Sequence, residues 1–166
     1  MSSKLFTPFN ILKSGVIRSL TLAAICLAFV TGCSKDDQLT LRNEEFPITA
    51  VGANGISGTI FIAENLDSTF TVTVKLNSSV KDTVHIMNIY NNNQGSASGI
   101  SVKLVDVVGT GGPVIGETMN IRQVIQSSGN YESMNYDQII SNPKILKVFY
   151  SNNQPDSLIA TALVGR

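Results

Sequence analysis

Apolar and polar side chains alternate along much of this chain, and this period of two constrains the fold more than any other feature. The clearest run places Phe70, Val72, Val74 and Leu76 between Thr69, Thr71, Thr73 and Lys75. Successive side chains of a β-strand point to opposite faces, so residues 68–76 are predicted to form a strand. We expect the four apolar side chains on the buried face and the other four on the wet face.

Segments of similar character follow, and turn residues separate them. Strands are predicted over residues 57–63, 83–90, 100–108, 144–151 and 157–164, which are rich in β-branched and aromatic residues. Loops are expected at 64–67, 91–95 and 109–113, and one short helix at 136–141, before Asn142 and Pro143. The pattern predicts an all-β fold: a single antiparallel β-sandwich or small Greek-key barrel with one short helix.

The first 32 residues do not share this pattern. Residues 1–18 hold three basic side chains and no acidic one, and residues 20–30 (LTLAAICLAFV) are apolar and uncharged. An apolar run of this length is shorter than the roughly 20 residues that span a bilayer. The order of a basic region and a short apolar region is typical of a secretory signal peptide. A short membrane anchor that is never cleaved is the alternative.

The end of this apolar run resembles the lipobox of bacterial lipoproteins. Residues 30–33 read Val-Thr-Gly-Cys, a branched apolar residue and two small residues before a cysteine. The resemblance implies that Cys33 receives a lipid and that the chain is cut before it. Cys26 lacks the small residue that must precede the cut. We therefore expect a signal peptide at 1–32, an acylated cysteine and charged tether at 33–38, and a β-domain at 39–166, with the lipid bilayer as partner through Cys33.

The residues after Cys33 resemble a sorting signal. The position directly after the cysteine is Ser34 rather than Asp, which by resemblance to Gram-negative lipoproteins implies transfer to the outer membrane. Lys35, Asp36 and Asp37 resemble the acidic tag that exports some lipoproteins to the cell exterior. A solvated, charged tether on a periplasm-facing protein is the alternative.

Charge and cysteine content exclude other classes of protein. The chain has 12 basic and 12 acidic residues, and loss of residues 1–32 leaves a net charge of about −3. Nucleic-acid binding calls for a clustered basic face, so we expect no nucleic-acid partner. The mature chain would keep one cysteine, the acylated Cys33, so no disulfide can form within it.

The order of elements is similar to that of the chordin-type CHRD domain. Residues 41–47 (LRNEEFP) resemble the opening of that family, 57–61 (SGTIF) and 70–74 (FTVTV) two of its strands, 84–87 (VHIM) its His-Ile-His segment, and 160–165 its final strand. The departures concern polar groups. The second histidine of that segment is Met87 here, a later one is Tyr150, and the closing Glu and Arg positions hold Leu158 and Ala160. The resemblance therefore implies the fold without the polar site of the family.

A direct search for chemistry finds no catalytic set, no metal site and no cofactor motif. Zinc requires three or four Cys, His or carboxylate ligands, and His85 is the one histidine of the chain. The segment 95–99 (GSASG) has Ala97 where a nucleophile would stand, and we expect a flexible loop there. Segment 109–113 (GTGGP) lacks the Lys-Ser/Thr pair of a phosphate-binding loop. His85 is expected to be a hydrogen-bonded residue of the sheet.

Three triplets suggest modification. Asp precedes Ser68, Thr83 and Ser157, each followed by Thr or an aliphatic residue, a pattern that resembles the O-glycosylation acceptor of some exported bacterial proteins. Ordinary turn chemistry is the alternative.

Together these features predict a surface-exposed outer-membrane lipoprotein with a non-catalytic β-sandwich binding or structural module, whose protein or glycan partner stays open. An enzyme or metal-binding protein with a site that the sequence hides is the alternative.

Overall fold

The computed structural model describes residues 41–93, 96–126, 128–151 and 154–166, and of residues 93, 96–98, 155 and 156 only the backbone. Thr40–Arg166 forms one compact unit. Its elements are β1 (Asn43–Ala50), β2 (Gly58–Glu64), β3 (Phe70–Leu76), β4 (Val84–Asn93), β5 (Ser96–Lys103), β6 (Val107–Val108), β7 (Val114–Ile121), β8 (Gln123–Ile125), β9 (Tyr131–Ser133), α2 (Tyr136–Ser141), β10 (Lys144–Ser151) and β11 (Gln154–Val164). The predicted all-β class is confirmed, with one short helix among the described residues.

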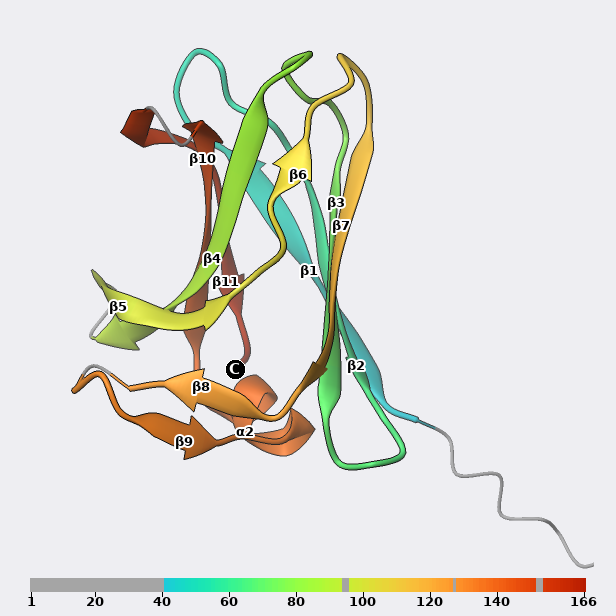
Figure 1. Cartoon of the computed structure of the whole chain (residues 1–166), viewed down its shortest axis with the longest axis vertical. Coiled ribbons are helices and arrows are strands. Elements are labelled where there is room, and N and C mark those ends of the chain that lie inside the picture. Colours follow the sequence, from blue (N-terminus) through green and yellow to red (C-terminus); the bar gives the residue numbers. More distant parts are fainter. Residues whose placement is uncertain (1–40, 94–95, 127, 152–153) are drawn as a thin grey trace, which may run out of the picture. The chain divides into compact units, whose positions relative to one another are not determined.

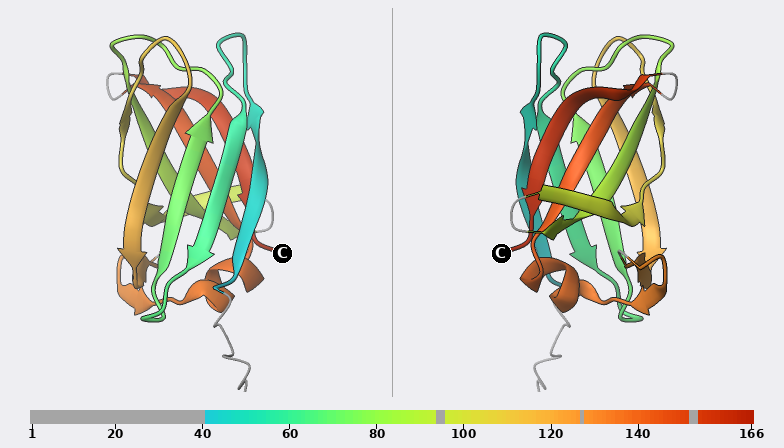
Figure 2. Two further views of the ribbon diagram at one scale, coloured as in Figure 1. Left: turned by 90° about the vertical axis from the view of Figure 1, so that its right-hand side faces the viewer. Right: turned by 90° about the vertical axis from the view of Figure 1, so that its left-hand side faces the viewer.

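One antiparallel sheet makes up most of this unit. Its strands run in the order β5-β4-β10-β11-β1-β2-β3-β7, and β6 pairs with β4. β1 joins the two halves, because its residues up to Ile48 pair with β2 whereas Thr49 and Ala50 pair with β11. Figure 2 shows the resulting two walls, β1-β2-β3-β7 on one side and β4-β10-β11 on the other. The sheet thus curls into a sandwich-like half-barrel.

The core fills the space between these walls. Phe70, Val72, Val74 and Leu76 of β3 are all at most 1 % exposed, which confirms the predicted inner face. They share the core with Ile60 and Ile62 of β2, Met87 and Ile89 of β4, and Leu146 and Val148 of β10.

Thr69 corrects the predicted outer face. It is buried rather than wet, because the strand begins one residue later and Thr69 belongs to the preceding turn. There the Asp67 carboxylate accepts hydrogen bonds from the Thr69 backbone N–H at 3.2 Å and from its Oγ1 at 2.6 Å. A satisfied polar group can be buried at little cost.

A small hairpin and the helix lie at one end of the two walls. β8 and β9 pair as a separate two-stranded sheet, and α2 follows directly (Figure 1). Asn135 caps the helix: its side chain accepts from the Gln138 N–H at 3.0 Å, and the Gln138 side chain accepts from the Asn135 N–H at 2.9 Å. This reciprocal capping satisfies two backbone donors and explains why so short a helix forms where it was predicted. Tyr136 and Ile139 anchor it in the core.

Several predicted boundaries are wrong, and pairing with a neighbouring strand or a hydrogen bond from another strand explains each one. Asn91–Asn93 belong to β4 rather than to a loop, because Asn91 pairs with Lys144 of β10. The segment 96–99 lies in β5 rather than in a flexible loop. The predicted strand 100–108 is two strands, broken at 104–106, where Thr118 Oγ1 accepts from the Val105 N–H at 2.9 Å. Sheet contacts here override local propensity.

Four strands were not predicted. β1 has one fully buried residue, Ile48, β7 contains Gly116, and β8 and β9 have three residues each. None of them shows a sustained alternation of apolar and polar residues, so pairing with neighbours defines them.

Candidate functional site

The residues predicted to direct lipidation and export lie outside the described part of the chain. This holds for Cys33, for Lys35, Asp36 and Asp37, and for the signal peptide as a whole. Their roles stay predictions. Among the residues that the structure does describe, no helix is long and apolar enough to cross a membrane.

The three candidate glycosylation sites differ in exposure. Ser68 is exposed in a turn, with a φ of 64°, whereas Thr83 and Ser157 are half-buried. Asp67, before Ser68, stabilises that turn, and its hydrogen bonds from Thr69 keep the pKa of its carboxyl below the ordinary value. The turn therefore explains why Asp67 precedes Ser68 without any need for glycosylation. Glycosylation stays a prediction, and Ser68 is the most accessible of the three.

His85 is a hydrogen-bonded residue of the sheet, as expected. It is fully buried, its Nε2 accepts from the Val80 N–H at 3.1 Å, and its Nδ1 lies 2.8 Å from the Tyr150 carbonyl oxygen. A carbonyl only accepts, so we assign the proton to Nδ1. The Tyr150 ring packs edge-on, with centroids 6.3 Å apart. The structure thus brings two positions of the CHRD resemblance together, with both imidazole nitrogens engaged.

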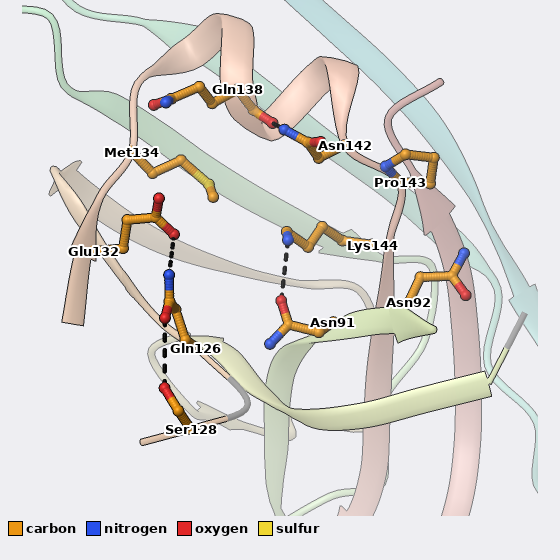
Figure 3. A pocket seen from close by; sticks show the side chains of 10 residues that line it. All are labelled: Asn91, Asn92, Gln126, Ser128, Glu132, Met134, Gln138, Asn142, Pro143 and Lys144. Carbon is orange, nitrogen blue, oxygen red and sulfur yellow. Dashed lines mark hydrogen bonds between the residues drawn. The ribbon is translucent and has the colours of Figure 1, made fainter. Parts of the chain in front are cut away.

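A polar pocket lies where the α2 end of the unit meets β4 and β10. It has a volume of about 540 Å³, within the range of small-molecule sites. We call it the amide pocket, because five of its ten lining residues are Asn or Gln. It is lined by Asn91, Asn92, Gln126, Ser128, Glu132, Met134, Gln138, Asn142, Pro143 and Lys144 (Figure 3).

Two inward-facing strand positions form the floor of the amide pocket. Lys144 begins β10 on the same face as the core residues Leu146 and Val148, and Asn91 continues the inner face of β4 after Met87 and Ile89. The register of the two strands sets Lys144 opposite Asn91. Directly opposed residues lie close enough for their side chains to interact, and the Lys144 ammonium donates to Asn91 Oδ1 at 3.0 Å.

The opposite side of the pocket comes from the β8–β9 hairpin. Gln126 Nε2 donates to the Glu132 carboxylate at 2.6 Å, and Ser128 Oγ lies 3.4 Å from Gln126 Oε1. Asn91 Nδ2 donates to the Ile125 carbonyl at 3.3 Å and so links the hairpin to β4. Figure 3 shows Glu132 and Gln126 facing Lys144 and Asn91 across the pocket.

The helix supplies the third side. Gln138 belongs to α2, and Asn142 follows it and donates from Nδ2 to the Gln138 carbonyl at 2.8 Å. This bond orients the Asn142 carboxamide and caps a carbonyl at the helix C-terminus. The pocket thus combines segments from 91 to 144 along the chain.

Lys144 is the electrostatic centre of the amide pocket. The residue is 8 % exposed, and burial lowers the pKa of its ammonium, an effect that the nearby Glu132 carboxylate partly offsets. The ion pairs between described residues join Arg42 to Glu64, Arg42 to Asp137 and Arg166 to Glu44, so none involves Lys144. A buried cation without a paired carboxylate is uncommon and marks a candidate binding site.

Sequence reasoning predicted the strand that holds Lys144 but not the pocket. A signal existed, because Lys144 occupies the row of Leu146 and Val148, where a strand with one buried face carries apolar residues. Asn91 gave no such signal, since the Asn run reads as a loop. Among described residues, no group of three or more His, Cys, Asp or Glu could hold a metal ion.

Comparisons with protein-family models, with curated proteins and with solved structures find no match for this chain.

Proposed function

We propose that this chain is a lipid-anchored protein of the outer membrane, displayed on the cell exterior, whose β-domain is a non-catalytic module that binds a small, hydroxyl-rich ligand. The anchoring part rests on the context of Cys33 and on the tag Lys35, Asp36 and Asp37. The binding part rests on one observation, the amide pocket with the buried Lys144 at its floor. Kinship with the CHRD family belongs to the same proposal and adds no functional residue to it.

The chemistry of the pocket supports binding over catalysis. Carboxamides both donate and accept hydrogen bonds, as sugar hydroxyls do, and they neither gain nor lose a proton near neutral pH. The ionisable groups of the lining are Glu132 and Lys144. Glu132 is exposed at the rim and already accepts a hydrogen bond from Gln126. Such a site recognises a polar molecule by hydrogen bonds and orients it.

Catalysis is the competing function, and Lys144 is the observation that favours it. A lysine with a lowered pKa in a pocket, near a carboxylate, is also a feature of active sites. Full-length protein in detergent micelles should therefore be tested with a panel of neutral and acidic monosaccharides and their glycosides, by ligand-observed NMR. Binding without change of the ligand supports the module, and turnover that Lys144→Met abolishes would establish an enzyme.

The lipid anchor has its own test. Because a thioether holds the diacylglyceryl group, Cys33→Ser should abolish incorporation of a clickable palmitate and leave the signal peptide uncut. Cys26→Ser is the matched control and should incorporate label like the parent chain. Label in the Cys33→Ser protein would contradict lipidation at this residue.

Surface display is tested separately. Replacing Lys35, Asp36 and Asp37 together by Ala should protect the protein from protease added to intact cells, while palmitate incorporation persists. If the added protease cleaves the triple variant as it cleaves the parent protein, these three residues form a solvated tether and not an export tag.

A further inference from the structure

Building on the binding function proposed above, we infer that the amide pocket takes a sugar that carries one carboxylate, and that the Lys144 ammonium receives this carboxylate. The inference names the ligand class and the residue that selects it. A hexuronate such as glucuronate is the simplest molecule of this class.

The first support is the unmatched charge of Lys144. An ammonium has three N–H donors, and within the described chain one is used, by Asn91 Oδ1 at 3.0 Å. Figure 3 shows the side chain running toward the middle of the pocket. Burial of a charge is costly unless the charge is paired. A ligand carboxylate at this position would supply the missing partner and would form charge-assisted hydrogen bonds, which are about twice as strong as neutral ones.

The second support is that Lys144 is held in place before any ligand arrives. Its backbone lies in β10, and Asn91 fixes the ammonium while its own Nδ2 is bound to the Ile125 carbonyl at 3.3 Å. A lysine side chain loses much rotamer freedom when it is fixed. Because the fold has already ordered this side chain, less of that cost falls on ligand binding.

The third support is the charge balance, which favours a monoanion. Lys144 is the one cation of the lining, and Glu132 adds a carboxylate on the facing side. A phosphate dianion would carry one negative charge more than Lys144 can match, and Glu132 would repel it about twice as strongly as a carboxylate at the same place. A single carboxylate matches the ammonium, and hydroxyls on the rest of the ligand can donate to Glu132.

The fourth support is the arrangement of the carboxamides. Asn91, Gln126, Gln138 and Asn142 come from β4, the β8–β9 hairpin, α2 and the residue after α2, so four separate segments line the pocket, and the Gln138 carboxamide also caps α2. Each carboxamide already makes a hydrogen bond within the domain and keeps a further N–H or oxygen lone pair that a ligand hydroxyl can use. This arrangement fits a ring with hydroxyls on several sides better than a linear aliphatic acid.

The test compares glucuronate, glucose and acetate as probes of the full-length protein in detergent micelles. Glucuronate should bind more tightly than both, because glucose lacks the carboxylate and acetate lacks the hydroxyls. Lys144→Met, which keeps the length of the side chain without its charge, should weaken glucuronate binding about tenfold or more and leave weak glucose binding unchanged. Lys147→Met is the matched control: Lys147 lies on the same strand but points to the Tyr90 ring, 5.2 Å from its centroid, and binding should stay within about twofold.

Asn91→Asp is a second variant that tests the same inference if Lys144→Met does not fold. This nearly isosteric change places a carboxylate beside the Lys144 ammonium and removes the hydrogen bond from Asn91 Nδ2 to the Ile125 carbonyl. It should weaken glucuronate binding as strongly as Lys144→Met does, because the new carboxylate pairs with the ammonium. A cooperative urea transition of the variant shows that the fold is kept.

Three results overturn the inference. The first is that glucose binds as tightly as glucuronate, and the second is that both variants bind glucuronate like the parent chain. In either case Lys144 does not recognise a carboxylate, but the proposed binding function is kept. The third is that no sugar binds, which contradicts both the proposed binding function and this inference. Lipidation at Cys33 is tested independently by palmitate incorporation.

Discussion

Two buried serines show how single polar residues contribute differently to this domain. Ser79 is 7 % exposed, and its Oγ donates to the Gly112 carbonyl at 2.6 Å and accepts from the Thr110 N–H at 2.9 Å. It thereby holds the 109–113 loop. Ser101 is fully buried on β5, and its Oγ has no hydrogen-bond partner within the described residues. A buried hydroxyl stabilises a fold only when it is hydrogen-bonded.

The two serines should therefore respond in opposite ways to truncation. Ser79→Ala leaves a carbonyl and an N–H without their partner and should lower the free energy of unfolding by about 1–3 kcal/mol. Ser101→Ala removes an unpaired hydroxyl and should change it by less than about 0.5 kcal/mol, or raise it. Urea unfolding of both variants measures the difference. Equal losses would contradict the unpaired state of the Ser101 hydroxyl.

A residue of the candidate site could be predicted from the sequence only where it interrupts the alternation of apolar and polar residues in a strand. Lys144 stands out in the sequence, because a charged residue occupies a core row of β10. His85 was predicted to be structural, and its two hydrogen bonds confirm this. Asn91 could not be singled out, since its role depends on a partner 53 residues away.

At the scale of elements, β3 shows why alternation is informative. Its inner row is buried to within 1 % and its outer row is half-buried or exposed. Both neighbours are antiparallel partners, β2 and β7, so the strand lies inside the sheet. A shift of register by one residue would turn four apolar side chains outward, and this penalty fixes the register.

Substitutions on the inner and outer rows of β3 should change the free energy of unfolding by clearly different amounts. Val72→Ala leaves a cavity in the core and should lower the free energy of unfolding by about 2 kcal/mol or somewhat more. Lys75→Ala, on the exposed row of the same strand, should stay within about 0.5 kcal/mol. Thr71 is a less clean control, since its Oγ1 contacts the Asn65 carboxamide at 3.2 Å. A loss at Lys75 equal to that at Val72 would contradict the assigned faces.

At the scale of the whole β-domain, Arg42, directly before β1, connects two elements that are distant in the chain, β2 and α2. Its guanidinium pairs with Glu64 at the end of β2, at 2.7 Å and 2.8 Å, and with Asp137 of α2 at 2.6 Å, and it lies 5.0 Å from the centroid of the Tyr136 ring. Its hydrogen bonds lower the pKa of the Glu64 carboxyl below the ordinary value of 4.5. Arg42 and Asp137 are exposed and Glu64 is half-buried, so salt screens the pairs and each contributes little.

This network should make stability depend on pH. Because the folded-state pKa of Glu64 is lowered, its contribution is complete above the ordinary value of 4.5 and is lost as the pH falls through the lower folded value. The lowered pKa of Asp67 acts in the same direction. Arg42→Gln should lower the urea midpoint at pH 6, and the gap to the parent protein should narrow toward pH 3. Lys103→Gln, at an exposed position of β5, is the control without such a gap. A gap that stays constant with pH would contradict the linkage.

The sequence by itself determined the class of fold, the core face of β3, the bounds of α2 and the structural role of His85, because these depend on local periodicity, capping and the type of a single residue. Strands without strong alternation, such as β1 and β7, were decided by tertiary pairing. The amide pocket was decided in the same way. Lys144 lies opposite Asn91 only because β4 and β10 pair in one register, and the β8–β9 hairpin and α2 meet them at that end. Contacts between residues far apart in the chain leave no periodic trace in the sequence, so only the tertiary structure could show this pocket.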